Sequence, residues 1–450
     1  MHDTPGDESG PGPEAPPGHM TLEDAFALAL RSHRSGNLPM AERIYRAILT
    51  AVPDHVDSLH FLGLLLHQGG ASSLGVELIR RAVALRPDYV DALSNLGNVL
   101  CAMGRPAEAA EVWRRVVALA PHPQAYNNLG VLLKGEGRCE EAAAALRRAI
   151  DLDPGRGDAH FNLGNVLMLL GRADEARSEY RRAVELDPGF IGAQEALART
   201  LVQSGRCEEA REVFEMLLAA SPGNPIAHHV LAALTGRDVP DRASDEYVVQ
   251  AFDSFAETFE HVLTTLGYRA PEVLSAAAAA VLEDRAGSLD VLDAGCGTGL
   301  CGPLLRPLAR RLTGVDLSAE MLARAQARGL YDELVRAELT GYLGDHAGGF
   351  DLIVAADTLI YFGDLAPVLS AAAGALRGDG VLAFNLEDGG EAIGASGFRL
   401  QPNGRYEHGE EAVRHRLDEA GFGQVTIRRD ALRREWDRML TGLFVLARRT

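Results

Sequence analysis

The chain has no apolar run long enough to cross a membrane and no excess of basic residues. No segment of its 450 residues approaches the ~18 consecutive apolar positions that a membrane-spanning helix needs. The formal net charge of −19 opposes general binding to nucleic acid. The sequence therefore predicts a soluble protein that binds neither a membrane nor nucleic acid.

Cysteine is scarce. The five cysteines are an odd number, and their spacings match neither a disulfide framework nor a metal-binding cluster. Cys139 and Cys207 hold the same place in two copies of the segment GRCEEA, whereas Cys296 and Cys301 lie in a glycine-rich segment. This usage fits the reducing cytoplasm and predicts a cytoplasmic protein without a metal site.

The first twenty residues lack an apolar block and contain no lysine or arginine. Proline and glycine occupy nine of these positions, and four others are acidic. A segment of this composition cannot bury enough apolar surface to offset the entropy lost on folding. Signal and transit peptides both need basic residues. Residues 1–20 are therefore predicted to be a disordered leader.

The first half of the chain contains a repeat. Prolines and glycines recur in one register, 33 or 34 residues apart, at Pro53, Pro87, Pro121, Pro154, Pro188 and Pro222 and at Gly36, Gly70, Gly104, Gly137, Gly171 and Gly205. This period, with small residues at fixed helical offsets, resembles the tetratricopeptide repeat. The resemblance covers residues 21–235 and implies an all-α solenoid of six helix pairs and a final lone helix. Stacking of the pairs buries their apolar faces.

Asparagines recur in the first helix of several repeats, at Asn95, Asn98, Asn127, Asn128, Asn162 and Asn165. In tetratricopeptide proteins, asparagines at these positions commonly bind the backbone of an extended peptide. The resemblance therefore implies a protein or peptide partner in the groove that these helices line. The alternative is that the asparagines follow the repeat consensus and contact only water. No ring of lysines is evident for binding a terminal carboxylate.

The segment Val291–Leu300, VLDAGCGTGL, carries the clearest chemical signal. A short apolar run ends at Asp293 and is followed by alternate glycines, which leave the backbone and the start of the next helix open to a ligand. A second apolar run ends at Asp316. In a doubly wound sheet this carboxylate would lie beside the glycine loop, where it can accept hydrogen bonds from ribose hydroxyls. The spacing predicts a site for a nucleoside-type cofactor.

Two cofactor classes fit this segment. Gly297, Gly299 and Gly302 satisfy the dinucleotide pattern G-x-G-x-x-G, so NAD is one alternative. However, an acid precedes the glycines, which suits a cationic ligand, and Pro303 follows Gly302 in the first helical turn. The segment resembles motif I of the class I S-adenosylmethionine-dependent methyltransferases, and Asp316 resembles their second motif. A glycine-rich turn without a ligand is the remaining alternative.

Strands and helices alternate from about residue 289, which predicts a parallel sheet. We expect strands at 290–294, 312–316, 333–338, 350–357 and 380–387 and helices at 303–311, 318–328, 365–376 and 410–420. Pro307 should kink or shorten the first of these helices. Two last strands, 424–430 and 440–449, are close enough in sequence to pair antiparallel. Residues 285–450 are thus predicted to be an α/β Rossmann-like methyltransferase domain, with a mostly parallel seven-stranded sheet and an antiparallel last strand.

The resemblance implies roles for the residues of both motifs. Asp293 would help to hold the methionine end of S-adenosylmethionine. Gly295, Gly297 and Gly299 would let the cofactor lie against the backbone, and Asp316 would bind the ribose hydroxyls.

Three further residues are expected near the adenine. Leu317 would flank the ring, and Glu338, followed by Leu339, would approach the adenine amino group after the third strand. The family more often has Asp at the position of Glu338, so this chain departs from the pattern there.

Residues 236–284 are predicted to form a polar linker and then a helical lid. Phe252, Phe255 and Phe259 recur at helical spacing and are expected to pack against the following domain. Many small-molecule methyltransferases fold a comparable helix over cofactor and acceptor, so Tyr247 and Phe255 are candidate lid residues.

Two residues are candidate catalytic bases. Asp357 ends the fourth strand, on the side where an acceptor should enter, and a helix N-cap or a loop hydrogen bond is its alternative role. His408 follows the fifth strand, and a surface position before a helix is its alternative. Because the sulfonium methyl group is already electrophilic, positioning without a base is a further possibility.

The sequence thus predicts S-adenosylmethionine-dependent methyl transfer to an unidentified acceptor, with the repeats recruiting a protein partner. A small metabolite is the first choice of acceptor, and a protein side chain or a carrier-bound acyl group is the second. The alternative is a tetratricopeptide scaffold whose methyltransferase-like domain is catalytically silent. An NAD oxidoreductase would need hydride-transfer residues, which we cannot place in the sequence.

Overall fold

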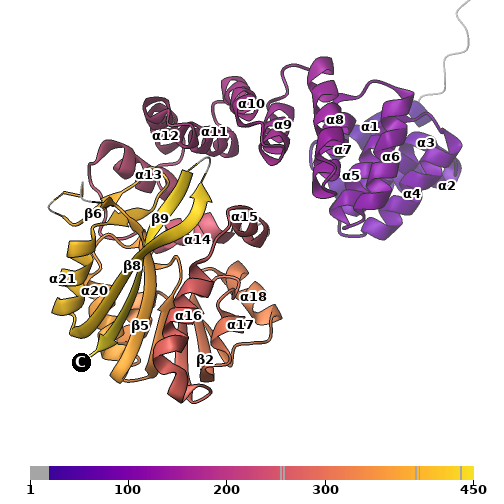
Figure 1. Cartoon of the computed structure of the whole chain (residues 1–450). Helices are drawn as coiled ribbons and strands as arrows, with labels where there is room; N and C mark the ends of the chain where they lie inside the picture. The colour runs from indigo at the N-terminus through magenta and orange to yellow at the C-terminus, as the bar shows by residue number, and fades with distance from the viewer. Residues whose placement is uncertain (1–19, 254–255, 257–258, 391–392, 395, 436–437) are drawn as a thin grey trace, which may run out of the picture. The chain divides into compact units, whose positions relative to one another are not determined.

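The computed structural model describes residues 20–450 apart from positions 254–255, 257–258, 391–392, 395 and 436–437 (Figure 1). The expected leader, apart from Met20, and the candidate lid residue Phe255 lie outside the described residues. The chain divides into two compact units, with the boundary between Ala193 and Gln194. None of the helices in the described ranges has the length and apolar character needed to cross a bilayer.

The first unit is built of helices at the expected repeat spacing. They are α1 (Leu22–Arg34), α2 (Leu38–Ala51), α3 (Val56–Gln68), α4 (Ser72–Leu85), α5 (Val90–Ala102), α6 (Pro106–Leu119), α7 (Pro123–Gly135), α8 (Cys139–Leu152), α9 (Gly157–Leu169) and α10 (Ala173–Leu186). Helix α11 (Ile191–Gln203) spans the boundary, and α12 (Cys207–Ala220) and α13 (Pro225–Thr235) follow it. The expected helical repeat array is confirmed.

Glycine has two separate uses in this array. The glycines that recur in register, such as Gly104 (φ +70°) and Gly171 (φ +73°), end first helices in the left-handed region, where they turn the chain. Inside the helices, glycine permits close crossing. A Cβ at Gly97 would lie 2.3 Å from Nε1 of Trp113, and one at Gly164 would lie 2.5 Å from the ring of Tyr180.

The second unit continues with helices α14 (Asp245–Asp253), α15 (Phe259–Thr265), α16 (Ala270–Leu282), α17 (Gly302–Leu305), α18 (Ala319–Ala327), α19 (Leu339–Gly344), α20 (Ala366–Ala375) and α21 (Glu410–Glu419). Its strands are β1 (Leu289–Ala294), β2 (Ala309–Asp316), β3 (Glu333–Arg336), β4 (Phe350–Ala355), β5 (Leu376–Asp388), β6 (Phe398–Leu400), β7 (Tyr406–His408), β8 (Phe422–Glu435) and β9 (Arg438–Arg449).

Seven strands form the main sheet in the order β3-β2-β1-β4-β5-β9-β8. The first five are parallel, whereas β9 runs antiparallel to both β5 and β8. This is the mostly parallel sheet with an antiparallel last strand that the sequence predicts. The order reverses between β1 and β4, so a crevice for a ligand is expected at the carboxyl ends of these strands.

A short hairpin, β6–β7, adds to this sheet. Glu387 of β5 pairs with Glu407 of β7 and also with Gly442 of β9, so β7 lies on the β4 side of β5, beyond the last residue of β4. The sequence predicts no strands at these positions.

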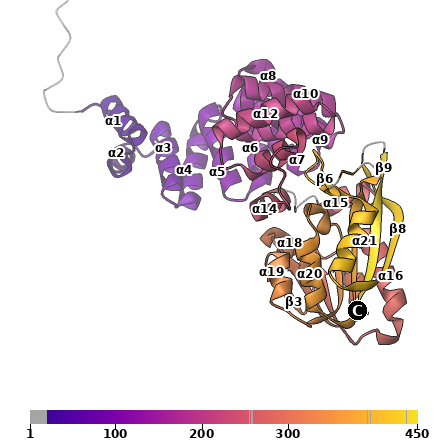
Figure 2. The same ribbon diagram turned by 90° about the vertical axis from the view of Figure 1, so that its left-hand side faces the viewer.

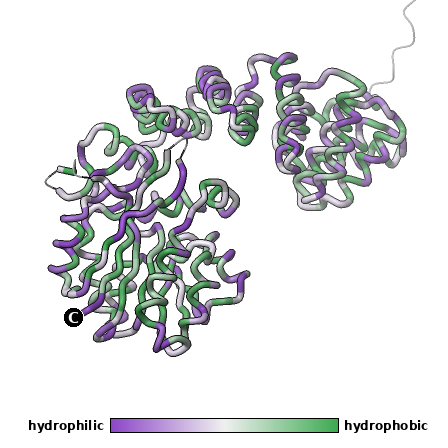
Figure 3. Tube along the Cα trace, in the orientation of Figure 1, coloured by the Kyte–Doolittle hydropathy of each residue, from purple (hydrophilic) through white to green (hydrophobic). Residues whose placement is uncertain are grey.

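Helices cover both faces of the sheet. Residues of α19, α20 and α21 pack on one face, and residues of α16 and α17 pack on the other. Figure 2 shows α20 and α16 on opposite sides of the strands. Every residue of β1 and β4 is buried, as expected for central strands of a parallel sheet with helices on both faces. Hydrophobic residues are concentrated in the strands and helices of this sheet in Figure 3.

Several predicted boundaries are wrong. The strand expected at 350–357 ends at Ala355, so Asp357 follows the strand and does not end it. The helix expected at 303–311 ends at Leu305, before Pro307, and β2 already begins at Ala309. The expected shortening at Pro307 is therefore observed, and the charged residues that follow it belong to a strand. The strand expected at 333–338 ends at Arg336, because Glu338 is the N-cap of α19.

Candidate functional site

The glycine-rich segment forms a loop between β1 and α17. Its backbone is left-handed at Gly295 (φ +70°), Gly297 (φ +54°) and Gly299 (φ +85°), a region that residues with side chains seldom adopt. A Cβ at Gly295 would lie 2.3 Å from Oγ1 of Thr358, whereas a Cβ at Gly297 would meet no atom within 4 Å. The loop therefore leaves the backbone at Gly297 open to a ligand.

Asp316 is the last residue of β2, lies beside this loop and is hydrogen-bonded to it. Its Oδ2 accepts a hydrogen bond from the amide of Gly297 (2.8 Å), and its Oδ1 accepts one from the amide of Ser318 (2.9 Å). Burial raises the pKa of the Asp316 carboxyl, although backbone hydrogen bonds oppose the rise. The structure thus brings the two sequence motifs together.

Asp293, in β1, is almost completely buried, with 1% of its surface exposed. Its Oδ2 accepts a hydrogen bond of 2.6 Å from the hydroxyl of Tyr331. Burial raises the pKa of Asp293 to about 7; the Tyr331 hydrogen bond opposes this rise, and the charge of Asp316 adds to it. A carboxyl of this kind changes its charge near neutral pH.

These residues fit S-adenosylmethionine. Two carboxylates end adjacent parallel strands, and the loop between them has an open glycine. In the same loop, Oγ1 of Thr298 is buried and has no hydrogen-bond partner among the described residues. A buried hydroxyl without a partner is costly, so a ligand that bonds to it would remove that cost. The donor set suits a cationic amino-acid end and ribose hydroxyls.

The residues expected near the adenine have partners within the protein. Glu338 accepts hydrogen bonds from the amides of Thr340 (3.0 Å) and Gly341 (2.8 Å). Burial opposes ionisation of Glu338, but these amides outweigh it, and its pKa lies below the usual value. Leu339 belongs to the apolar cluster that includes residues of α20, while Leu317 is partly exposed. Glu338 therefore caps a helix that the sequence does not predict.

Asp357 lies just after β4 in a strained conformation, with φ +52°. Its backbone amide donates to Oδ1 of Asn385 (2.9 Å), whose Nδ2 donates to Oδ1 of Asp357 (2.5 Å). Its Oδ2 accepts a hydrogen bond of 2.5 Å from Arg433 of β8, which also pairs with Glu387 of β5. Both carboxylate oxygens of Asp357 thus have partners, of which one is a buried cation.

His408 lies in β7 and is 2% exposed, so the alternative that it is a surface residue is wrong. Its Nε2 donates to the carbonyl oxygen of Gly363 (3.2 Å), because a carbonyl can only accept. Its Nδ1 has no partner among the described residues. Burial lowers the pKa of His408 to about 4, so the imidazole is neutral at pH 7.

Helices α14 and α15 pack on the domain, as the aromatic spacing predicts for Phe252. The ring of Phe252 lies 5.5 Å from that of Tyr361. Asp253 accepts a hydrogen bond from Oγ of Ser318, the residue that also donates its amide to Asp316. The lid candidate Tyr247 packs instead on His229 of α13, with ring centroids 4.1 Å apart.

A second contact joins α15 to the glycine loop. Glu260 of α15 pairs with Nη2 of Arg328 (2.8 Å), and Nε of Arg328 donates to the carbonyl of Thr298 (2.6 Å). Sequence reasoning missed Arg328, Tyr331 and Arg433. No spacing in the sequence marks them, since their partners lie 30, 38 and 76 residues away.

The repeat asparagines bond largely to one another. Nδ2 of Asn128 donates to Oδ1 of Asn98 (2.9 Å), and Nδ2 of Asn162 donates to Oδ1 of Asn127 (3.0 Å). In the same way, Asn95 bonds to His60 (3.0 Å) and Asn165 accepts a hydrogen bond from Tyr180 (2.9 Å). All of these except Asn127 remain partly or fully exposed. The asparagines therefore link neighbouring helices and also present polar atoms to solvent.

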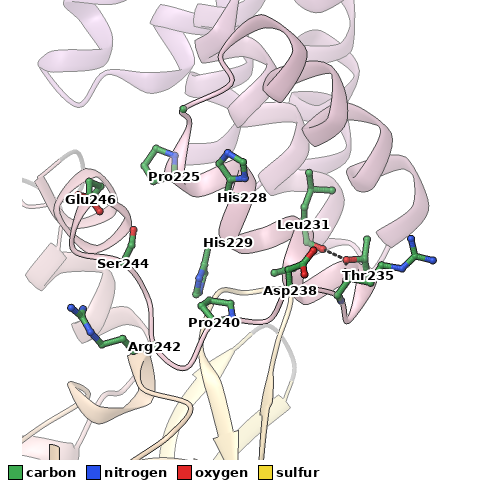
Figure 4. Close-up of a pocket in the computed structure, with 13 residues that line it drawn as sticks. Pro225, His228, His229, Leu231, Thr235, Asp238, Pro240, Arg242, Ser244 and Glu246 are labelled. Carbon is green, nitrogen blue, oxygen red and sulfur yellow. Dashed lines mark hydrogen bonds between the residues drawn. The ribbon is translucent and has the colours of Figure 1, made fainter. Parts of the chain in front are cut away.

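A cavity of about 570 Å³ lies at α13 and the linker (Figure 4). It is lined by His228 and His229 of α13 and by Pro240, Arg242 and Ser244 of the following segment. None of its lining residues belongs to the glycine loop or to a strand. The sequence predicts no site there.

Models of known families match both halves of the chain. Three tetratricopeptide repeat models match the first half. One matches residues 26–90 and 132–189, the second matches residues 88–154, and the third matches residues 171–234. A methyltransferase domain model matches residues 291–380. The chain thus consists of tetratricopeptide repeats followed by a methyltransferase domain, as the sequence resemblance implies.

Individual relatives match only parts of the chain. Methyltransferase-like protein 27 of Homo sapiens is 38% identical over 97 residues, which are 21% of this chain and 38% of that protein. Malonyl-[acyl-carrier protein] O-methyltransferase of Magnetococcus marinus is 37% identical over 102 residues, covering 21% and 36%. Both matches span less than two thirds of the relative. The crystal structure of MamA is similar at 26% identity with a TM-score of 0.34, covering 36% of this chain and 95% of that one.

Proposed function

We propose that this protein transfers a methyl group from S-adenosylmethionine to a small-molecule acceptor. In this proposal residues 285–450 form the catalytic domain, residues 236–284 the linker and lid, and residues 21–235 bind a protein partner. The observation that carries the proposal is the bond between Oδ2 of Asp316 and the amide of Gly297, because it places a carboxylate against an open glycine backbone.

In this proposal Asp293 and Asp316 bind opposite ends of the cofactor. Asp293 would attract the ammonium group of the methionine end, and Asp316 would accept hydrogen bonds from the ribose hydroxyls with lone pairs that Gly297 and Ser318 leave free. Leu317 and Leu339 would flank the adenine, with Glu338 near its amino group. When bound, S-adenosylmethionine supplies an electrophilic methyl group on a sulfonium.

We further propose that positioning and exclusion of water dominate the chemistry. Asp357 and His408 remain the candidate bases, but Asp357 is engaged by Asn385 and Arg433, and His408 is enclosed. These contacts favour a role for Asp357 in shaping the acceptor pocket. One relative is named as an O-methyltransferase of a malonyl-carrier protein, which keeps a carrier-bound acyl group as the second choice of acceptor.

Calorimetry of the full chain with S-adenosylhomocysteine tests the cofactor. We expect binding by the wild type and a loss of 10- to 100-fold in affinity for Asp316→Ala, since two ribose hydrogen bonds contribute about 1.5–3 kcal/mol. Glu320→Ala is the matched control, because Glu320 is an exposed acid in the next helix and should bind normally.

Three outcomes would count against the proposal. Binding of NADH instead of S-adenosylhomocysteine would show that the glycine loop is a dinucleotide site. Normal affinity of Asp316→Ala for S-adenosylhomocysteine would show that Asp316 does not bind the cofactor. Binding without methyl transfer to any acceptor from a metabolite extract would favour the alternative, a tetratricopeptide scaffold with a silent domain.

A further inference from the structure

Tyr331 lies in the segment between α18 and β3, with its ring close to Gly299 and Gly302 of the glycine-rich segment and to Gly314 of β2. A Cβ added to Gly299 or Gly314 would lie 3.0 Å from this ring, and a Cβ at Gly302 would lie 3.1 Å from its hydroxyl. Three glycines therefore give Tyr331 room. Gly302, which completes the formal dinucleotide pattern, is accounted for by this aromatic ring.

The hydroxyl of the same ring bonds to the most buried acid of the site. It donates to Oδ2 of Asp293 at 2.6 Å. Burial and the nearby Asp293 charge keep the pKa of the Tyr331 phenol well above its usual value, so the phenol is protonated and can donate near neutral pH. A hydrogen bond of this kind favours the ionised form of a carboxyl.

We propose that Tyr331 is a positioning residue that orients Asp293 and holds it in the form that receives the ammonium group of the cofactor. The proposal rests on the function proposed above, since it concerns the same site. Without Tyr331, the Asp293 carboxyl would keep no side-chain hydrogen-bond donor among the described residues, and burial would favour its neutral form.

Few neighbouring groups change their charge near pH 7, so proton release on ligand binding can be assigned to Asp293. Tyr331 and Asp316 shift the pKa of Asp293, and Asp293 in turn raises the pKa values of its neighbours Cys296, Cys301 and Tyr268. Burial raises the pKa of both cysteines and of Tyr268 well above their usual values, so these three stay neutral near pH 7. Asp316 is the charged group, among the described residues, that raises the pKa of Asp293, and Tyr331 donates to Asp293 rather than to Asp316.

The test is calorimetry of S-adenosylhomocysteine binding to the full chain between pH 6 and 9, in two buffers that differ in ionisation heat. The pKa of Asp293 is about 7, so wild type should release about half a proton per ligand from this group at pH 7. Tyr331→Phe should release closer to one, and the midpoint of its affinity profile should move upward by about one pH unit. Above that midpoint its affinity should approach that of the wild type.

Two further variants make the test decisive. Asp293→Asn should release no proton from this position on ligand binding, and its affinity should show no midpoint between pH 6 and 9. The same should hold when Asp293→Asn is combined with Tyr331→Phe. Tyr342→Phe is the matched control, because Tyr342 is a buried tyrosine that packs on His346 and should leave the profile unchanged.

The possible failures are distinguishable. If Tyr331→Phe weakens binding equally at every pH, with an unchanged midpoint and proton count, Tyr331 only fills space and the inference is overturned. If Tyr331→Phe does not fold, a wild-type midpoint that persists in Asp293→Asn overturns it as well. If the wild type binds no S-adenosylhomocysteine at any pH, the proposed function itself fails.

Discussion

Arg433 and Asp357 form an ion pair of 2.5 Å that joins the terminal hairpin to the turn after β4. The Arg433 side chain is 2% exposed and also pairs with Glu387, whose side chain is 5% exposed. Charges held this far from water depend on one another, because neither can be hydrated if its partner is removed.

We therefore expect Arg433→Met to destabilise the domain by about 3–5 kcal/mol, since it leaves Asp357 without its cation and Glu387 with Arg405 alone. The exposed pair of Arg414 and Glu410 on α21 provides the control. Arg414→Met should cost at most about 0.5 kcal/mol. Denaturant unfolding of the full chain measures both, and equal costs for the two variants would show that the Arg433 pair is not buried in solution.

A base role for Asp357 or His408 can be separated from positioning. Removal of a general base should lower the single-turnover rate by about 10²–10⁴-fold with cofactor affinity kept. Because both groups are engaged or enclosed, we expect Asp357→Asn and His408→Asn to lose less than about tenfold once an acceptor is identified. A loss in the larger range for either variant would assign the base.

His408 should make stability depend on pH. Its folded-state pKa of about 4 lies below the usual value of 6.5, so between these pH values the unfolded chain binds more protons and stability falls as pH falls. The contribution of His408 is complete above pH 6.5 and should be lost by pH 4, a change of about 3 kcal/mol. His408→Gln should flatten this part of the curve in denaturant titrations at several pH values. Parallel curves for the two proteins would contradict this.

Helix α13 should stabilise the methyltransferase domain. Nε2 of His229 donates to the carbonyl of Gly404 (3.0 Å), and Ala232 packs with Leu400 and Tyr406. A fragment that begins at residue 222 should therefore be more stable than one that begins at residue 240, by about 1–3 kcal/mol of apolar burial and hydrogen bonding. Residues 20–193 should fold alone as a helical unit. Circular dichroism melts of the three fragments test this, and equal melting of the two longer ones would show that α13 adds nothing.

The repeat asparagines should matter for partner binding only. We expect the triple substitution of Asn95, Asn128 and Asn162 by alanine to abolish selection of peptides from a display library while cofactor affinity stays unchanged. Each loss of an inter-helix hydrogen bond should cost about 0.5–1.5 kcal/mol, so a thermal melt must confirm that the variant folds. A fall in cofactor affinity would mean that the repeats contribute to the active site.

Much of the architecture follows from sequence alone because the signals are local. The repeat register depends on proline and glycine spacings within one helix pair, and the glycine loop depends on a strand, three glycines and an acid that ends the next strand. Even the shortening of the helix at Pro307 is a local effect, because proline has no amide to donate. These patterns determined the fold class and placed Asp293 and Asp316 at one edge of the sheet.

The tertiary structure alone decided which side chains complete the site. Tyr331 is hydrogen-bonded to Asp293, which lies 38 residues away in the sequence, and Arg433 is hydrogen-bonded to Asp357, which lies 76 residues away. Neither partner is marked by a local pattern, because a hydrogen bond between distant residues leaves no periodicity in the sequence. The burial of a single side chain likewise leaves no local pattern in the sequence. His408 reads as a surface residue or a base, but the β6–β7 hairpin encloses it, and desolvation then sets its charge.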